Sequence, residues 1–173
     1  MLAFWLQDIL LFLVSLPTGK LLNEPVRIGQ LVEALRYHWP NLTIVQKGDG
    51  VVRGDSRALT SVLTNLIHNA VKHGEASEIR LTVEPRNNGP LALRVADNGR
   101  GFQGDFRELG KLFVRHARGS GSGVGLYISG QLAKRMNATL SFAPGNEGGF
   151  VAELILPGTS QPVLAEQQRQ KLA

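Results

Sequence analysis

The fold of this chain is decided by one stretch, Ser56-Arg-Ala-Leu-Thr-Ser-Val-Leu-Thr-Asn-Leu-Ile-His-Asn-Ala-Val-Lys72. Asp55, a good N-cap residue, stands immediately before it. The apolar side chains repeat at helical spacing, at Leu59, Val62, Leu63, Leu66, Ile67, Ala70 and Val71. The pattern predicts a long amphipathic helix over residues 56–72, with one face packed on a core.

A second edge of this helix is polar. Asn65, Asn69, Lys72 and His73 are spaced i, i+4, i+7 and i+8, so they share that edge. Asparagine is a poor residue in a helix interior, and two of them one turn apart favour a chemical role. A carboxamide oxygen suits Mg²⁺, and a lysine one turn further suits a phosphate oxygen. A solvated polar face is the alternative interpretation of this edge taken alone.

Helical and alternating patterns continue on both sides of the long helix. Two further helices are predicted over 28–37 and 124–136, and strands over 42–46, 51–53, 79–84, 91–96, 139–142 and 150–156. The segment Asn87-Asn-Gly-Pro90 predicts a hairpin between two of these strands. The order predicts an α+β fold, a two-layer α/β sandwich with three helices on one face of a mixed, mostly antiparallel sheet of about five strands.

Composition restricts the class of protein. Hydrophobic residues make up 43% and charged residues 19% of the 173 residues, as in a soluble globular domain. The net charge is +5, with the basic excess concentrated between residues 100 and 118. Aromatic residues are only 6% of the chain and do not interleave with these basic residues, so no nucleic-acid partner is expected. The sequence has no cysteine, which excludes disulfides and thiolate chemistry.

A second polar cluster is Asp97-Asn-Gly-Arg-Gly-Phe102, which follows a strand whose apolar alternation ends at Ala96. A carboxylate at the end of a strand can accept a hydrogen bond from the exocyclic amine of adenine. The glycines let the backbone lie close to a flat ligand. An ordinary β-turn is the alternative, because Asp-Asn-Gly is common turn chemistry.

A third cluster is Gly119-Ser-Gly-Ser-Gly-Val-Gly-Leu126, which leads directly into the helix predicted over 124–136. Glycines before a helix leave backbone N–H groups free to face an anion, and the helix dipole favours a phosphate there. A flexible linker is the alternative for this segment alone. No Gly-Lys-Ser/Thr follows, so the cluster is not a P-loop.

In this order the three clusters resemble the ATP-binding domain of sensor histidine kinases, in the wider superfamily of gyrase, Hsp90 and MutL. Residues 65–73 are similar to the family's N box, 97–102 to its first glycine box and 121–126 to its second. Phe113 stands where the family has its F box. The resemblance covers residues 23–158 and implies the Bergerat ATP-binding fold, with ATP and Mg²⁺ as cofactors.

The resemblance also implies a role for each matching residue. Asn69 would bind Mg²⁺, with Asn65 as a second candidate ligand. The catalytic group would be Asn69, Lys72 and Arg118, the last of which follows the F box and would face the γ-phosphate. The residues in contact with the nucleotide would be Asn65, Asn69, Lys72, His73, Asp97, Gly99, Gly101, Phe102, Phe113, Arg118, Gly121, Gly123, Val124, Gly125 and Leu126.

One position separates the kinases from the ATPases of this superfamily. The ATPases resemble one another in placing a general-base glutamate where this chain has Asn65, and an amide cannot accept a proton from water. The resemblance therefore implies transfer of the γ-phosphoryl group to a protein histidine. His38, His68, His73 and His116 do not lie in a phosphoacceptor motif. The acceptor histidine is therefore expected on a dimerisation domain that is missing from this chain.

Three parts of the chain are expected: residues 1–22 as the C-terminal stub of a dimerisation and phosphoacceptor helix, 23–158 as the ATP-binding catalytic domain, and 159–173 as a disordered tail. The expected partners are the dimerisation and phosphoacceptor domain of the same kinase and a response regulator downstream. The full-length protein is expected to be a homodimer through the N-terminal helix, located in the cytoplasm or forming the cytoplasmic part of an inner-membrane sensor. The alternatives are a serine kinase resembling anti-sigma factors and a non-catalytic, nucleotide-binding regulatory module of the same fold.

Overall fold

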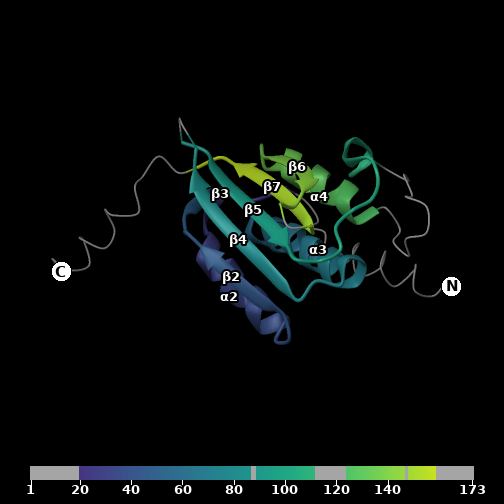
Figure 1. Cartoon of the computed structure of the whole chain (residues 1–173). Coiled ribbons are helices and arrows are strands. Elements are labelled where there is room, and N and C mark those ends of the chain that lie inside the picture. Colours follow the sequence, from purple (N-terminus) through teal and green to yellow (C-terminus); the bar gives the residue numbers. More distant parts are fainter. Residues whose placement is uncertain (1–19, 87–88, 112–123, 147, 159–173) are drawn as a thin grey trace.

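The computed structural model describes residues 20–86, 89–111, 124–146 and 148–158 (Figure 1). Its elements, in chain order, are β1 (Glu24–Arg27), α2 (Ile28–His38), β2 (Thr43–Lys47), β3 (Val51–Gly54), α3 (Ser56–Gly74), β4 (Glu78–Pro85), β5 (Leu91–Asp97), the short 3₁₀ helix η1 (Phe106–Glu108), α4 (Val124–Arg135), β6 (Thr139–Pro144) and β7 (Phe150–Leu156). Each helix and strand predicted within these residues is present, with ends that differ by at most two residues.

Five of the strands form the main sheet in the order β2-β4-β5-β7-β6. β2 runs parallel to β4, and the other neighbours are antiparallel. The core lies on one face of this sheet because alternate strand residues are buried there, among them Leu81, Val95 and Leu154. α2, α3 and α4 cover that face, behind the strands in Figure 1. The predicted two-layer α+β sandwich is confirmed.

The sixth predicted strand, over residues 51–53, lies outside the main sheet. It is β3, and it pairs antiparallel with β1. β1 was not predicted from the sequence, because four residues that include Pro25 are too few to show an alternation. On its other side β3 contacts the residue that follows β7, because the Arg53 N–H donates a hydrogen bond to the Pro157 carbonyl at 2.9 Å. The two ends of the described chain therefore meet at β3.

α3 begins at a carboxylate with no solvent exposure, Asp55. The predicted N-cap is confirmed, since Asp55 Oδ1 accepts the backbone N–H groups of Arg57 at 3.0 Å and Ala58 at 3.4 Å. The same carboxylate takes two hydrogen bonds from the Arg57 guanidinium and one, at 2.9 Å, from the N–H of Leu22. Asp55 thus fixes both the start of α3 and the path by which the chain enters the domain.

Two expectations fall outside the described residues. These are the stub helix, apart from its last residues, and the tail over 159–173. Within the described ranges, none of the helices combines the length and the apolar character that crossing a bilayer requires.

Candidate nucleotide site

The second half of α3 carries the polar edge predicted from the sequence. Asn69 is partly buried, and its side chain makes no hydrogen bond within the described part of the chain. One turn earlier, the Asn65 amide donates to the Ser129 hydroxyl of α4 at 2.8 Å. Lys72 and His73 lie in the last turn of the helix. The two asparagines therefore have different surroundings, although the sequence gives them equivalent places.

Asp97 occupies a core-facing position at the end of β5. It lies opposite Ile79 of β4, on the same side of the sheet as the buried Val95. Its Oδ1 accepts the backbone N–H groups of Gly99 at 2.9 Å and Phe150 at 3.2 Å. Burial raises the pKa of the Asp97 carboxyl, and these two hydrogen bonds act in the opposite direction. The second oxygen, Oδ2, accepts nothing from the described residues and can serve a ligand.

Glycines allow three backbone segments to meet around Asp97. A Cβ at Gly99 would lie 2.4 Å from the carbonyl oxygen of Gly74, at the end of α3. Gly149, just before β7, has a φ of +75°, and a Cβ there would lie 2.1 Å from the carbonyl oxygen of Asp97. Gly101, with a φ of +72°, abuts Gly149 in the same way. These positions need glycine because any side chain would push the segments apart.

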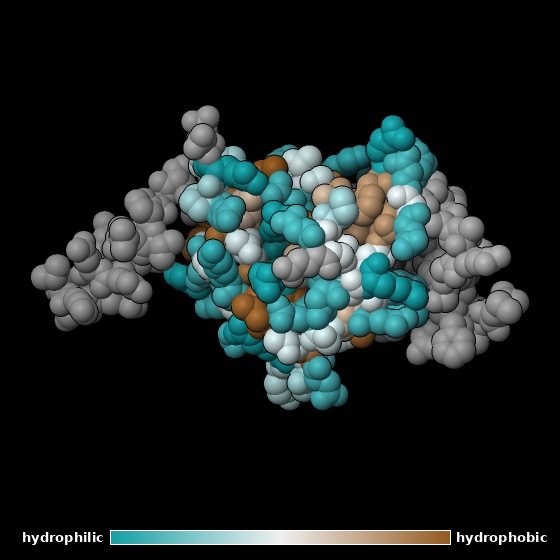
Figure 2. Space-filling model, in the orientation of Figure 1, coloured by the Kyte–Doolittle hydropathy of each residue, from teal (hydrophilic) through white to brown (hydrophobic). Residues whose placement is uncertain are grey.

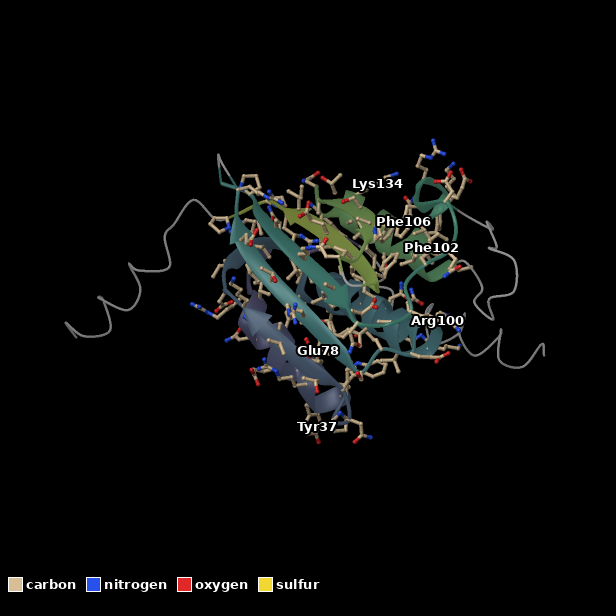
Figure 3. The ribbon with its side chains drawn as sticks, viewed as in Figure 1. Tyr37, Glu78, Arg100, Phe102, Phe106 and Lys134 are labelled. Atoms are coloured by element: carbon tan, nitrogen blue, oxygen red, sulfur yellow. The ribbon has the colours of Figure 1, made fainter. Side chains whose placement is uncertain are left out.

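Asn98 holds the loop after β5 against the start of β4, and Arg100 holds it against the end of α3. Neither residue was predicted from the sequence to belong to the site. Asn98 Oδ1 accepts the backbone N–H of Glu78 at 2.9 Å. Arg100 donates from its backbone to the Gly74 carbonyl at 2.8 Å and from Nε to the His73 carbonyl at 2.7 Å. Figure 3 shows Arg100 at this end of the sheet. The common tendency of asparagine to bind nearby backbone in turns was the available signal.

Phenylalanine side chains form an apolar wall beside Asp97. The rings of Phe102 and Phe106 meet edge to face at 5.2 Å, and Phe106 stacks on Phe150 at 5.8 Å. Phe142 joins them through Phe150 at 5.6 Å. Figure 3 labels Phe102 and Phe106 near α4, and Figure 2 shows a tan patch in the same area of a mostly hydrophilic face. The backbone N–H of Phe150 also donates a hydrogen bond to Asp97, which links the apolar wall to the carboxylate.

The first turn of α4 contains Val124, Gly125 and Leu126, as predicted. It packs on α3 at Asn65, since a Cβ at Gly125 would lie 2.5 Å from Asn65 Oδ1. Four other predicted residues, Phe113, Arg118, Gly121 and Gly123, lie outside the described residues, and their roles stay predictions.

α3 sets the length of the candidate site. Asn65 meets the start of α4, and Gly74 meets the loop that follows Asp97. These two residues are nine positions apart, or about 14 Å along the helix axis. Asn69 lies between them. A carboxylate, a carboxamide and the amide end of a helix thus follow one another along α3, at a spacing that suits the base, the metal and the phosphates of an extended nucleotide.

The donor set fits a magnesium ion that is held mainly by a ligand. No cluster of three or more histidine, cysteine or acidic side chains in the described ranges forms a metal cage. Mg²⁺ commonly takes one or two protein oxygens and completes its shell with water and phosphate oxygens. The Asn69 carboxamide, without a hydrogen-bond partner among the described residues, is such an oxygen.

Fold and site together define a nucleotide-binding domain, and comparison with known proteins gives its family. Residues 54–160 match the histidine kinase-, DNA gyrase B- and HSP90-like ATPase family. Signal transduction histidine-protein kinase AfsQ2 of Streptomyces coelicolor is 36% identical over an alignment of 153 positions that covers 84% of this chain and 28% of that protein. Sensor-type histidine kinase PrrB of Mycobacterium tuberculosis is 31% identical over 149 residues, 80% of this chain and 33% of that protein.

The crystal structure of the ATP-binding domain of Mycobacterium tuberculosis PrrB superposes with a TM-score of 0.63 at 26% identity, covering 80% of this chain and 98% of that one. The chain therefore belongs to the histidine kinase-, DNA gyrase B- and HSP90-like ATPase family, and it is an ATP-binding domain of the sensor histidine kinase type. This confirms the resemblance stated from the sequence. The chain spans only about a third or less of the length of these two curated relatives, at 28% and 33%.

Proposed function

We propose that this chain is the part of a two-component sensor kinase that binds Mg²⁺ and ATP. It transfers the γ-phosphoryl group to a histidine on the dimerisation and phosphoacceptor domain of the same kinase. A response regulator then receives the phosphoryl group, and the kinase works as a homodimer whose catalytic domain, residues 23–158, lies in the cytoplasm. The observation that carries this proposal is the row of Asp97, Asn69 and the start of α4 along one helix.

Each end of this row suits a different part of the nucleotide. Asp97 Oδ2 accepts a hydrogen bond from the exocyclic amine of the base, which lies beside the apolar wall of Phe102 and Phe106. The first turn of α4 offers backbone N–H groups and the positive end of a helix dipole to the phosphates. Lys72, with Arg118 as the resemblance implies, adds positive charge, and His73 would reach the phosphates. Asn69 would hold Mg²⁺, which would neutralise phosphate charge.

The chemistry favoured here is phosphoryl transfer to a protein. The imidazole nitrogen of the acceptor histidine attacks the γ-phosphorus, and the bond to the bridging oxygen breaks, so that ADP leaves with the electron pair. No carboxylate stands at position 65 to take a proton from water, because Asn65 is an amide that donates to Ser129. The site therefore contributes positioning and charge neutralisation.

Replacing Asn69 with alanine tests the metal role. We expect N69A to weaken binding of a non-hydrolysable ATP analogue about tenfold or more with Mg²⁺ present, and to leave binding in EDTA unchanged. Thr64→Ala is the matched control, since Thr64 is an exposed residue on the same helix. Titration calorimetry measures both conditions. An equal loss with and without Mg²⁺ would show that Asn69 does not hold the metal.

The transfer reaction is tested with radiolabelled ATP. The chain alone is expected to remain unlabelled, and the histidine-bearing domain of the parent kinase is expected to gain an acid-labile, base-stable label when both are mixed. An acid-stable label on a serine would instead support the serine-kinase alternative. Nucleotide binding without any transfer would support the regulatory alternative.

A further inference from the structure

Ser129 is one of two buried polar residues in the described part of the chain, the other being Asp55. It lies in the middle of α4 with 1% of its surface exposed. Its hydroxyl accepts the hydrogen bond from Asn65 Nδ2 at 2.8 Å, so the pair joins α4 to α3. A buried polar group is costly unless it is paired, which makes this contact a specific link between the two helices.

Gly125, one turn before Ser129 on the same face of α4, completes the link. A Cβ at Gly125 would lie 2.5 Å from Asn65 Oδ1 and 3.0 Å from Asn65 Nδ2. The Asn65 amide therefore fills the space that the missing side chain leaves. Its oxygen faces the first turn of α4, at the positive end of the helix dipole, and this polarity is favourable. The amide is held on one side by Ser129 and on the other by Gly125.

We propose that Asn65 is a positioning residue and that Ser129 fixes it, so that the two asparagines of α3 have separate functions. Asn65 holds the first turn of α4 at the phosphate end of the site, and Asn69 is the metal-binding asparagine. This inference rests on the proposed function and changes the role of Asn65, which the family resemblance offered as a second metal ligand. The Asn65 amide donates from Nδ2 to Ser129, and its Oδ1 lies against the backbone of Gly125, so the side chain is enclosed between the two helices.

The first test compares Ser129→Ala and Ser129→Cys with Gly130→Ala. Cysteine is slightly larger than serine and weakens the hydrogen bond without leaving a cavity. Gly130 is the control, because a Cβ there would meet nothing within 4 Å. We expect both Ser129 variants to weaken binding of a non-hydrolysable ATP analogue about tenfold, by the same factor with Mg²⁺ and in EDTA, because the phosphate end shifts. G130A is expected to bind as the wild type does.

The pattern across conditions separates positioning from metal binding and from general stability. N69A should lose affinity only with Mg²⁺, and the Ser129 variants should lose it in both conditions at a temperature where circular dichroism shows them fully folded. Wild-type affinity in S129A and S129C, or a loss confined to Mg²⁺, would overturn the inference. Failure of the wild type to bind any nucleotide would instead overturn the proposed function.

A second test does not depend on nucleotide. Gly125→Ala is expected to lower the melting temperature, because its Cβ would collide with the Asn65 amide. In an Asn65→Ala background the same change is expected to raise the melting temperature, since the space is open and alanine is the better helix former. The sign of the G125A effect therefore reverses if Asn65 fills this space. The same negative sign in both backgrounds would show that Asn65 is not held there.

Discussion

Asp97→Asn is expected to weaken ATP binding about a hundredfold, through the loss of a charge-assisted hydrogen bond and its replacement by a repulsive contact. The geometry makes this substitution unusually informative. The backbone N–H groups of Gly99 and Phe150 both donate to Oδ1, so the asparagine must keep its carbonyl oxygen there. Its NH₂ group then replaces Oδ2 and meets the amine of adenine, donor against donor.

The amide of D97N is also expected to change the base preference of the site. A hypoxanthine base carries a carbonyl oxygen where adenine has its amine, so the D97N amide can donate to it. We expect the variant to bind the inosine analogue at least as well as the adenosine analogue, while the wild type prefers adenosine strongly. Asp49→Asn, an exposed carboxylate near α2, is the control and should leave both affinities unchanged. Equal weakening for both bases would contradict the assignment of Oδ2 to the base.

The D97N substitution is not expected to lower the stability of the ligand-free chain, although it weakens ATP binding. Burial raises the pKa of the Asp97 carboxyl in the folded chain, so the folded state holds this proton more tightly than the unfolded state does. Stability therefore falls as pH rises from the unfolded value, about 3.9, through the raised folded value. D97N removes that loss, and its melting temperature at neutral pH without ligand is expected to equal or exceed that of the wild type. A lower melting temperature would mean that the charge itself supports the fold.

The sequence predicted the elements of this fold because their patterns are local. The long helix, its cap at Asp55 and the alternation in β4 and β5 each show within about ten residues. β1 escaped notice because four residues carry no period. The pairing of β2 with β4, the one parallel pair of the main sheet, depends on contacts between residues 35 positions apart, such as Thr43 and Glu78.

The candidate site, like the fold, has some features that are visible in the sequence and others that are not. The chemical residue types of Asn69, Asp97 and Gly125 are visible in the sequence, and the glycines mark close approaches of the backbone. The contacts that orient them are not visible, since Phe150 reaches Asp97 across 53 positions and Ser129 reaches Asn65 across 64. A serine in the apolar face of α4 was the one signal of the second contact, and its meaning depends on how α4 packs against α3.

The largest effect on stability is expected from Asp55→Ala. This carboxylate caps α3, pairs with Arg57 and binds the N–H of Leu22 from a position with no solvent exposure. Alanine removes the cap and leaves the N–H groups of Leu22, Arg57 and the buried Ala58 without this acceptor, which we expect to cost roughly 2–4 kcal/mol in the free energy of unfolding. For a domain of this size the melting temperature should fall by roughly 8–16 °C, measured by calorimetry or circular dichroism at neutral pH.

Asp105 provides a matched control within the same chain. It is also followed two residues later by an arginine, and it accepts from the Arg107 backbone at 2.9 Å and from the guanidinium at 2.8 Å. The local motif is thus the same at both places, but Asp105 is exposed and Asp55 is buried. Asp105→Ala is expected to change the melting temperature little, because exposed ion pairs contribute little. Equal effects of the two substitutions would show that the local motif, rather than burial and the bond to Leu22, determines stability.

The pH dependence of stability is a second measurement of the role of Asp55. The Arg57 guanidinium holds the pKa of the Asp55 carboxyl well below its usual range, so the contribution of this group to stability is complete above the unfolded value of about 3.9. It is lost as pH falls through the folded value. Asp55→Asn, which does not titrate, should lose less stability than the wild type between neutral pH and about pH 3. If the two curves ran parallel, other carboxylates would control the acid unfolding, and the link between Leu22 and α3 would not depend on the charge of Asp55.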